Sequence, residues 1–211
     1  EWWMGAPVSS ASSTAPRILL LDGGVSTHLE YKLQQEQEQE QNEKADQATL
    51  PISFQYPEIW SSSLLLTPQG RQMILDGHRD WFEAGSHALS TVTYQCHYHT
   101  ATWPRHCPEL QTPEDMNDLW QQGIALAVQA AQEQRHKNHA NNNKDPDFVI
   151  ASSGCFGAAL ANGAEYTGDY GPSQTIDTLV AFHRRKLDAI QRHGGGDDGG
   201  VDGIAIETVP S

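Results

Sequence analysis

The chain has 211 residues, and its 13 Lys and Arg residues against 27 Asp and Glu residues give a formal net charge of -14. This charge argues against nucleic-acid binding through phosphate contacts. No apolar run approaches the ~18 residues that a membrane-spanning helix needs, so we expect no membrane association. The three cysteines are too scattered for a disulfide framework, and we expect reduced thiols in a cytoplasmic protein.

The first predicted strand follows residues 1–16, whose Ser, Ala and Pro content predicts a disordered lead-in. Residues 17–211 are expected to form one domain. The four apolar residues Ile18–Leu21 predict a strand buried on both faces, as in parallel sheets. Asp22 ends this strand, and the glycines that start at Gly23 allow the backbone to turn sharply or to approach a ligand closely.

A low-complexity insert occupies residues 34–50. A short helix is predicted before it, from Val25 to Leu33. The insert begins with alternating Gln and Glu residues, which cannot build a core, and we interpret it as a solvated loop.

Two later helices have recognisable starts. Thr67 is a favourable N-cap followed by a proline, and this helix is predicted to end at Gly85. Thr112 has the same arrangement, and Asp115 at the third helical position supplies negative charge to the first turn.

Three more strands are predicted after the first, at His87–Tyr94, Phe148–Ser152 and Val201–Ile206. A segment punctuated by glycines, residues 154–172, follows the middle one, and a helix capped by Ser173 or Thr175 precedes the last. Strands that alternate with helices and lack hairpin signals predict parallel βα units in an α/β fold. The pattern fits either a doubly wound sheet or half of an eight-stranded barrel.

In either fold, functional sites gather at the carboxyl ends of the strands. Asp22, Thr93, Gly154 and Glu207 are all predicted to lie there. Two carboxylates at one end of a sheet have two interpretations. They hold a cationic group, such as the ammonium of an amino acid, or they are structural and cap helices or form ion pairs.

A second candidate site is the loop after the second strand, where Cys96, His97, His99 and Cys107 are zinc-type ligands. They suggest a metal-dependent hydrolase as an alternative function. The same residues also occur in solvated or partly packed loops, and neither C-x-x-C nor H-E-x-x-H is present. No nucleotide-binding glycine motif follows a strand.

Several motifs, in order, resemble the homocysteine S-methyltransferase family. The block Gly157–Gly168, with its Glu-Tyr-Thr-Gly end, is the longest and most specific of them. The others are Leu20–Gly24, Trp60–Leu65, Thr93–Gln95, Phe182–His183 and Ile206–Pro210. The resemblance implies a (β/α)8 TIM barrel that binds zinc through three cysteines. It also implies transfer of a methyl group to the thiolate of homocysteine, which gives methionine.

By position, the resemblance also implies roles for single residues. Asp22 and Glu207 match acidic residues that hold the homocysteine ammonium, and Gly23 matches a residue whose backbone amide lies against the amino acid. Thr91 falls at a position that lines the same pocket. Gln95 stands where betaine-using members have a donor-binding tyrosine, and the Glu-Tyr-Thr-Gly block is typical of relatives that use S-methylmethionine. S-methylmethionine is therefore the expected donor and S-adenosylmethionine the second choice.

The chain departs from the family in its cysteines. The family's zinc ligands follow later strands, beyond Ser211, and Cys96 and Cys155 do not stand at ligand positions. The chain therefore resembles the first four βα units without the metal site, a truncated barrel fragment expected to be inactive alone. A half barrel also leaves strand edges and the apolar sides of Ile18–Leu21 and Ile204–Ile206 uncovered, which predicts self-association.

Overall fold

The computed structural model describes residues 18–43, 56, 58–100, 103–105, 107–141, 147–195 and 200–210. The predicted lead-in at residues 1–16 and the last part of the insert, residues 44–50, lie outside these ranges. Among the helices in them, none combines the length and the apolar character needed to cross a membrane.

Three parallel strands form the sheet, in the order β1 (Ala88–Ser90), β2 (Phe148–Gly154) and β3 (Gly203–Glu207). Ala88 pairs with Phe148 in the first ladder, and Gly154 pairs with Glu207 at the end of the second. The predicted parallel α/β sheet is therefore confirmed. The strand predicted over residues 87–94 is shorter than expected, because the chain turns at residues 92–95.

The prediction for Ile18–Leu21 is wrong in its burial. This segment joins the sheet through a single parallel bridge between Leu21 and Ala88, and its four side chains are 50–78% exposed. Among the described residues, β1 is its neighbour in the sheet, and no other described element buries these four side chains. Exposure of these residues and of Ile204 and Ile206 does confirm what was expected of an open sheet.

Three long helices begin at the predicted N-caps. Thr67 accepts a hydrogen bond from the Gly70 amide at the start of α2 (Pro68–Glu83). Thr112 and Asp115 form a reciprocal capping box at the start of α3 (Pro113–Ala140). Thr175, the second of the two candidates, caps α6 (Ile176–Gly194). A threonine at the N-cap position supplies a hydrogen-bond acceptor for an amide of the first helical turn that has no partner within the helix.

Helix α1 (Val25–Glu43) corrects the prediction that the insert starts as a loop. The helix continues through Gln34 and ends ten residues later than expected, at Glu43 rather than Leu33. Gln and Glu are good helix formers, so a polar repeat extends a helix that its first turns have already nucleated. The inner side of the first turns is packed, with Leu29 and Leu33 buried.

Two short helices, α4 (Phe156–Leu160) and α5 (Ala164–Thr167), fold the glycine-punctuated segment after β2. A Cβ atom on Gly157 would lie 2.3 Å from the Glu165 amide nitrogen and 2.5 Å from the Ala164 carbonyl carbon. Only glycine permits this approach, so Gly157 allows α4 and α5 to pack together. A 3-10 helix, η1 (Trp60–Leu66), precedes α2.

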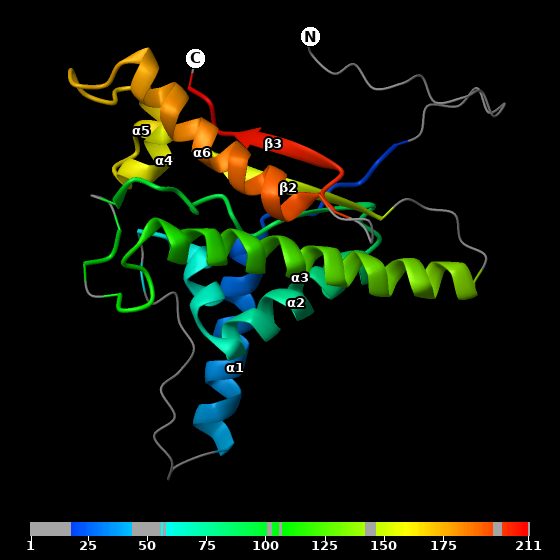
Figure 1. The fold of residues 1–211 in the computed structure, drawn as a ribbon. Helices are drawn as coiled ribbons and strands as arrows, with labels where there is room; N and C mark the ends of the chain where they lie inside the picture. The colour runs from blue at the N-terminus through cyan, green and yellow to red at the C-terminus, as the bar shows by residue number, and fades with distance from the viewer. Residues whose placement is uncertain are drawn as a thin grey trace, which may run out of the picture.

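One face of the sheet is covered by helices. Leu89 of β1 and Val149 of β2 are fully buried in a cluster with Leu75, Phe82, Ala127, Ala130 and Ala131 of α2 and α3. Figure 1 shows α3 crossing the molecule and α1 projecting away from the sheet, and α6 packs against α3 and contacts β2. The core therefore lies between the sheet and α2, α3 and α6, whereas β3 and residues 18–21 form the two edges of the sheet in the described part of the chain.

Candidate functional site

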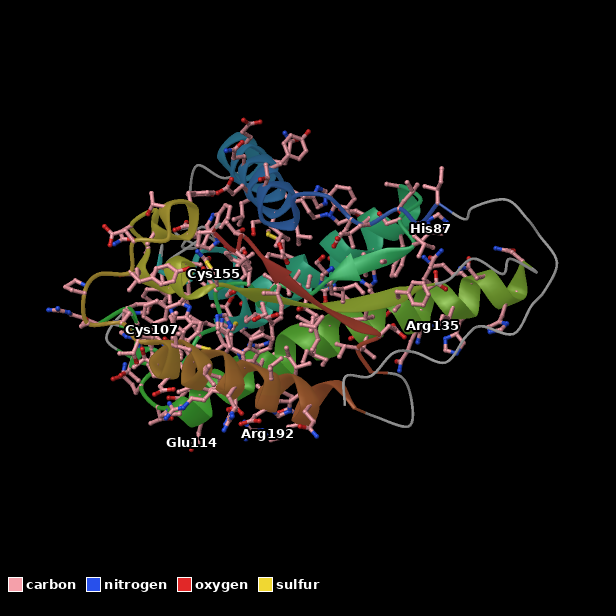
Figure 2. The ribbon with its side chains drawn as sticks, turned by 90° about the horizontal axis from the view of Figure 1, so that it is seen from above. His87, Cys107, Glu114, Arg135, Cys155 and Arg192 are labelled. Atoms are coloured by element: carbon pink, nitrogen blue, oxygen red, sulfur yellow. The ribbon has the colours of Figure 1, made fainter. Side chains whose placement is uncertain are left out.

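The carboxyl ends of the strands define one end of the molecule. Cys155 directly follows β2, and His87 directly precedes β1; Figure 2 shows these two residues at opposite ends of the sheet. Because the strands are parallel, the residues that end or follow them gather at the Cys155 end.

Asp22 is buried and receives two hydrogen bonds from Ser90. The Ser90 amide donates to Oδ2 at 2.6 Å, and the Ser90 hydroxyl donates to Oδ1 at 2.9 Å. Burial, with a smaller contribution from the negative charge of Glu207, raises the pKa of Asp22 to about 6 against the lowering effect of the two hydrogen bonds. A buried carboxylate whose partners are neutral can accept a cation.

Glu207 ends β3 and accepts a 2.5 Å hydrogen bond on Oε1 from the Ser152 hydroxyl. Ser152 belongs to β2, so the arrangement repeats that of Asp22, with a serine of the adjacent strand donating to the carboxylate. The electrostatic effect of Glu207 on Asp22 indicates that the two carboxylates share one polar region. The sequence-predicted pair therefore lies at the same end of the sheet.

Thr91 and Thr93 occupy the turn after β1, and both are buried. The Thr93 hydroxyl donates to the Ser152 carbonyl at 2.8 Å, and the Thr91 hydroxyl oxygen accepts from the Ser152 amide at 3.0 Å. The two hydroxyl oxygens are 2.5 Å apart. Because the Thr93 proton is engaged by the carbonyl, Thr91 donates to Thr93. The two threonines thus hold the turn against β2 at Ser152.

Gly23 is exposed and lies against Trp81 of α2. A Cβ atom at Gly23 would lie 2.6 Å from the Trp81 ring, so a larger residue would displace either the ring or the backbone next to Asp22. The glycine therefore keeps the backbone close to α2 at the edge of the site.

Lys186 is a buried cation that the sequence analysis did not single out. Its Nζ atom, which α6 carries beneath the end of β2, donates to the Gly154 carbonyl at 2.8 Å and lies 4.7 Å from the centre of the Phe182 ring. Burial lowers the pKa of Lys186 to about 8. A signal was present, because Lys186 lies four residues from both Phe182 and Ile190, on the buried face of the helix.

The cysteine and histidine residues of the loop after β1 do not form a metal site. The His97 ring lies 6.4 Å from Phe182, and the His99 ring lies 5.6 Å from Phe156. Burial raises the pKa of the Cys96 thiol to about 12. Over the described ranges, no group of three or more His, Cys, Asp or Glu side chains could hold a metal ion. The hydrolase alternative has no site there, and Cys96, Cys107 and Cys155 do not fit a zinc centre.

A cavity of about 500 Å³ lies on the other face of the sheet, between α6, the ends of β2 and β3, and the segment after β2. Its walls are mostly apolar, with Phe156, Leu179, Leu187 and Ile206 among them. Ser153 lines it, whereas Ser152, the next residue, points to the opposite face and binds Glu207. The cavity is therefore separate from the carboxylate pair.

Comparisons with known proteins identify relatives. Homocysteine S-methyltransferase 2 of Zea mays is 31% identical over 195 residues, which cover 92% of this chain and 48% of the relative. Homocysteine S-methyltransferase YbgG of Bacillus subtilis (strain 168) is 27% identical over 204 residues, which cover 97% and 54%. The chain spans about half the length of the curated relatives it matches.

A solved structure is also similar. The homocysteine methyltransferase MmuM from Escherichia coli, in its metallated form, matches with a TM-score of 0.63 and 27% identity, over 92% of this chain and 55% of that one. The model of the family described as homocysteine S-methyltransferase matches residues 19–211. Since that match includes nearly all of the described residues, the chain belongs to the homocysteine S-methyltransferase family.

Proposed function

We propose that this chain supplies the homocysteine-binding part of an enzyme that transfers a methyl group from S-methylmethionine to homocysteine and so forms methionine. S-adenosylmethionine is the second candidate donor. The observation that carries the proposal is the pair Asp22 and Glu207, two carboxylates held by serines at the carboxyl end of one parallel sheet. Family membership supports the choice of homocysteine as the amino acid.

The chemistry of the pair suits an ammonium group. The raised pKa of Asp22, about 6, leaves this carboxyl mostly ionised at neutral pH. The Asp22 carboxylate and the nearby Glu207 then both favour a bound cation. In the described part of the chain, the ion pairs involve other acidic residues and neither of these two. A ligand ammonium would therefore supply the countercharge that the fold does not provide.

The fold of the enzyme is proposed to be a (β/α)8 barrel, of which this chain forms the first units. Support comes from the order of the sheet, in which residues 18–21, β1, β2 and β3 are adjacent in chain order and parallel. Both outer edges are open, as they must be if further strands close the ring.

The residues described here bind and orient the amino acid, and we assign no metal to them. No group of described His, Cys, Asp or Glu residues could hold a metal ion, so activation of the homocysteine sulfur is not attributed to this part of the chain. Asp22 and Glu207 would hold the ammonium end, and Gly23 and Thr91 would lie along the same site. We accordingly expect the 211-residue chain to bind homocysteine but not to transfer a methyl group from S-methylmethionine.

Titration calorimetry with L-homocysteine, under reducing conditions, tests the proposal. Asp22→Asn or Glu207→Gln should weaken binding by about 10-fold to 150-fold, the range for one charged hydrogen bond of ~1.5–3 kcal/mol. N-acetylhomocysteine, which lacks the ammonium, should bind weakly to all forms. Glu114→Gln removes a charge from the start of α3 and is the matched control. Absence of homocysteine binding, or equal binding of the N-acetyl compound, would refute the proposal.

A further inference from the structure

Each carboxylate of the pair is held by a serine from the adjacent strand. Ser90, the last residue of β1, binds both oxygens of Asp22. Ser152, in β2, binds Oε1 of Glu207. Ser90 pairs with Ile150 and Ser152 pairs with Ala205, so both serines project from the same face of the sheet.

Ser90 and Ser152 have different effects on the carboxylates that they bind. The amide and hydroxyl of Ser90 approach both oxygens of Asp22, which orients the plane of its carboxylate and stabilises its ionised form. The backbone amide of Ser90 is present whatever the side chain, so only the hydroxyl contact depends on serine. Ser152 makes a single contact, and it orients Glu207 without acting on both oxygens.

The ionisation state of Asp22 depends on the Ser90 hydroxyl because of what surrounds the carboxyl group. The influences on its pKa are burial, the two contacts from Ser90 and the charge of Glu207 from β3. Burial and Glu207 favour the protonated, neutral carboxyl, and Ser90 alone favours the carboxylate. In the described ranges, Asp22 has no ion pair that could replace the contact.

We propose that Ser90 and Ser152 are positioning residues for ammonium recognition: Ser90 keeps Asp22 ionised and oriented, and Ser152 orients Glu207. The inference rests on the proposed function, because the ammonium is that of the bound amino acid. Neither serine is expected to contact the reacting atoms. Their effect is exerted through the two carboxylates.

The first test measures Asp22 itself and needs no ligand. The side-chain carboxyl carbon of Asp22, assigned by comparison with Asp22→Asn, is followed by NMR as a function of pH in the 211-residue chain. Ser90→Ala should move its titration midpoint upward by about one to two pH units, because one hydrogen bond to the charged form is lost. Ser90→Thr keeps the hydroxyl and should restore a midpoint close to that of the unmodified chain.

The matched control is Ser153→Ala. Ser153 follows Ser152 in β2 and is also buried, but it lines the cavity on the other face of the sheet. Its replacement should leave the Asp22 midpoint and homocysteine binding unchanged. A purely structural effect of losing a buried hydroxyl from this sheet would appear in Ser153→Ala as well.

The second test measures L-homocysteine binding at pH 6, 7 and 8. The loss of affinity caused by Ser90→Ala should be smallest at pH 8 and reach about fivefold to fiftyfold at pH 6, because an upward shift of one to two pH units leaves much less of Asp22 ionised there. Ser152→Ala should weaken binding about tenfold at every pH, because it removes the orientation of Glu207 and not the charge of Asp22.

The outcomes separate the two proposals. If the unmodified chain binds homocysteine but Ser90→Ala leaves the Asp22 midpoint in place, the inference is wrong and the proposed function stands. If the midpoint moves but Ser90→Ala binds homocysteine as well as the unmodified chain at all three pH values, Asp22 does not hold the ammonium and the inference is also overturned. If the unmodified chain does not bind homocysteine, the proposed function fails and the inference fails with it.

Discussion

The face of the sheet that packs against α2 and α3 is buried along β1 and β2 and exposed along β3, although its residues are apolar in both parts. Leu89 and Val149 are fully buried beneath α2 and α3, whereas Ile204 and Ile206 of β3 are 45% and 63% exposed. The neighbouring helix α6 repeats this contrast, because it buries Phe182 and exposes Ile176. Apolar character alone therefore does not decide burial; the presence of a second layer does.

The largest effect is expected in the helix layer of the covered side. Trp120 of α3 is fully buried, and its indole Nε1 donates to the Cys96 carbonyl at 3.1 Å. Trp120→Ala should lower the free energy of unfolding by about 3–5 kcal/mol, because it leaves a cavity and an unpaired carbonyl. Chemical denaturation followed by circular dichroism measures the change. A loss below about 1 kcal/mol would mean that this layer is not tightly packed.

A matched pair of truncations compares the two parts of the sheet directly. Leu89→Ala in β1 should cost about 2–5 kcal/mol, the range for a buried leucine. Ile204→Ala in β3 removes a side chain that water already reaches, and we expect a loss below about 1 kcal/mol. Equal losses from the two substitutions, measured in the same denaturation experiment, would show that β3 is covered in solution.

Local chemistry made part of this fold predictable. N-caps depend on residues within one turn: Thr67 and Thr112 cap their helices as predicted, and Thr175 is one of the two candidates for the last helix. The carboxylates Asp22 and Glu207 were also found from the sequence, because each stands where an apolar run ends. Strand ends of a parallel sheet share one edge, so the topology brought them together.

The other features of the fold could not be predicted from the sequence, because they depend on tertiary neighbours or because the composition of the segment is typical of a different structure. The exposure of Ile18–Leu21 reflects the lack of a covering layer among the described residues, which a run of four apolar residues cannot indicate. The repeat after Leu33 has the composition of a solvated loop, yet its residues are helix formers and α1 continues through them. Ser90 and Ser152 carry no local signal, since their role is defined by strand register.

At the polar end of the sheet, Asp22 is expected to have an effect of intermediate size on the free energy of unfolding. The pKa of Asp22 is about 6 in the folded protein and 3.8 in an unperturbed carboxyl, so the native state retains a proton that the unfolded chain has released between about pH 4 and 6. Stability should fall as pH rises through this window, by roughly 3 kcal/mol in all. Asp22→Asn should abolish that contribution.

The difference in stability between the unmodified chain and Asp22→Asn isolates the contribution of Asp22. Burial lowers the pKa of His78 to about 4, so His78 contributes stability that is present above pH 6.5 and lost as pH falls to about 4. This slope has the opposite sign and is common to both proteins, so it cancels in the comparison of denaturation midpoints at pH 4, 5, 6 and 7. A difference that does not change with pH would show that Asp22 is not perturbed by burial.

The smallest effect on stability is expected on the exposed stripe of α6, which consists of Ile176, Val180 and Leu187. All three line an apolar groove on α6, and Leu187 also lines the cavity that Ile206 of β3 borders. We predict that they drive self-association of the 211-residue chain despite its charge of -14. Ile176→Lys should change the free energy of unfolding by less than about 0.5 kcal/mol, because the side chain is 78% exposed. It should nevertheless shift the chain toward monomer in sedimentation velocity across a concentration series.

Charge must be separated from apolar contact in that experiment, and Ala181→Lys does so. It adds the same charge to an exposed position of the same helix, but successive residues turn by about 100°, so Ala181 points away from the stripe that contains Val180. If contact through the stripe drives association, Ile176→Lys reduces it and Ala181→Lys does not. Equal reduction by both would assign the effect to charge repulsion. An unmodified chain that stays monomeric at high concentration would show that an uncovered apolar face can remain solvated in this protein.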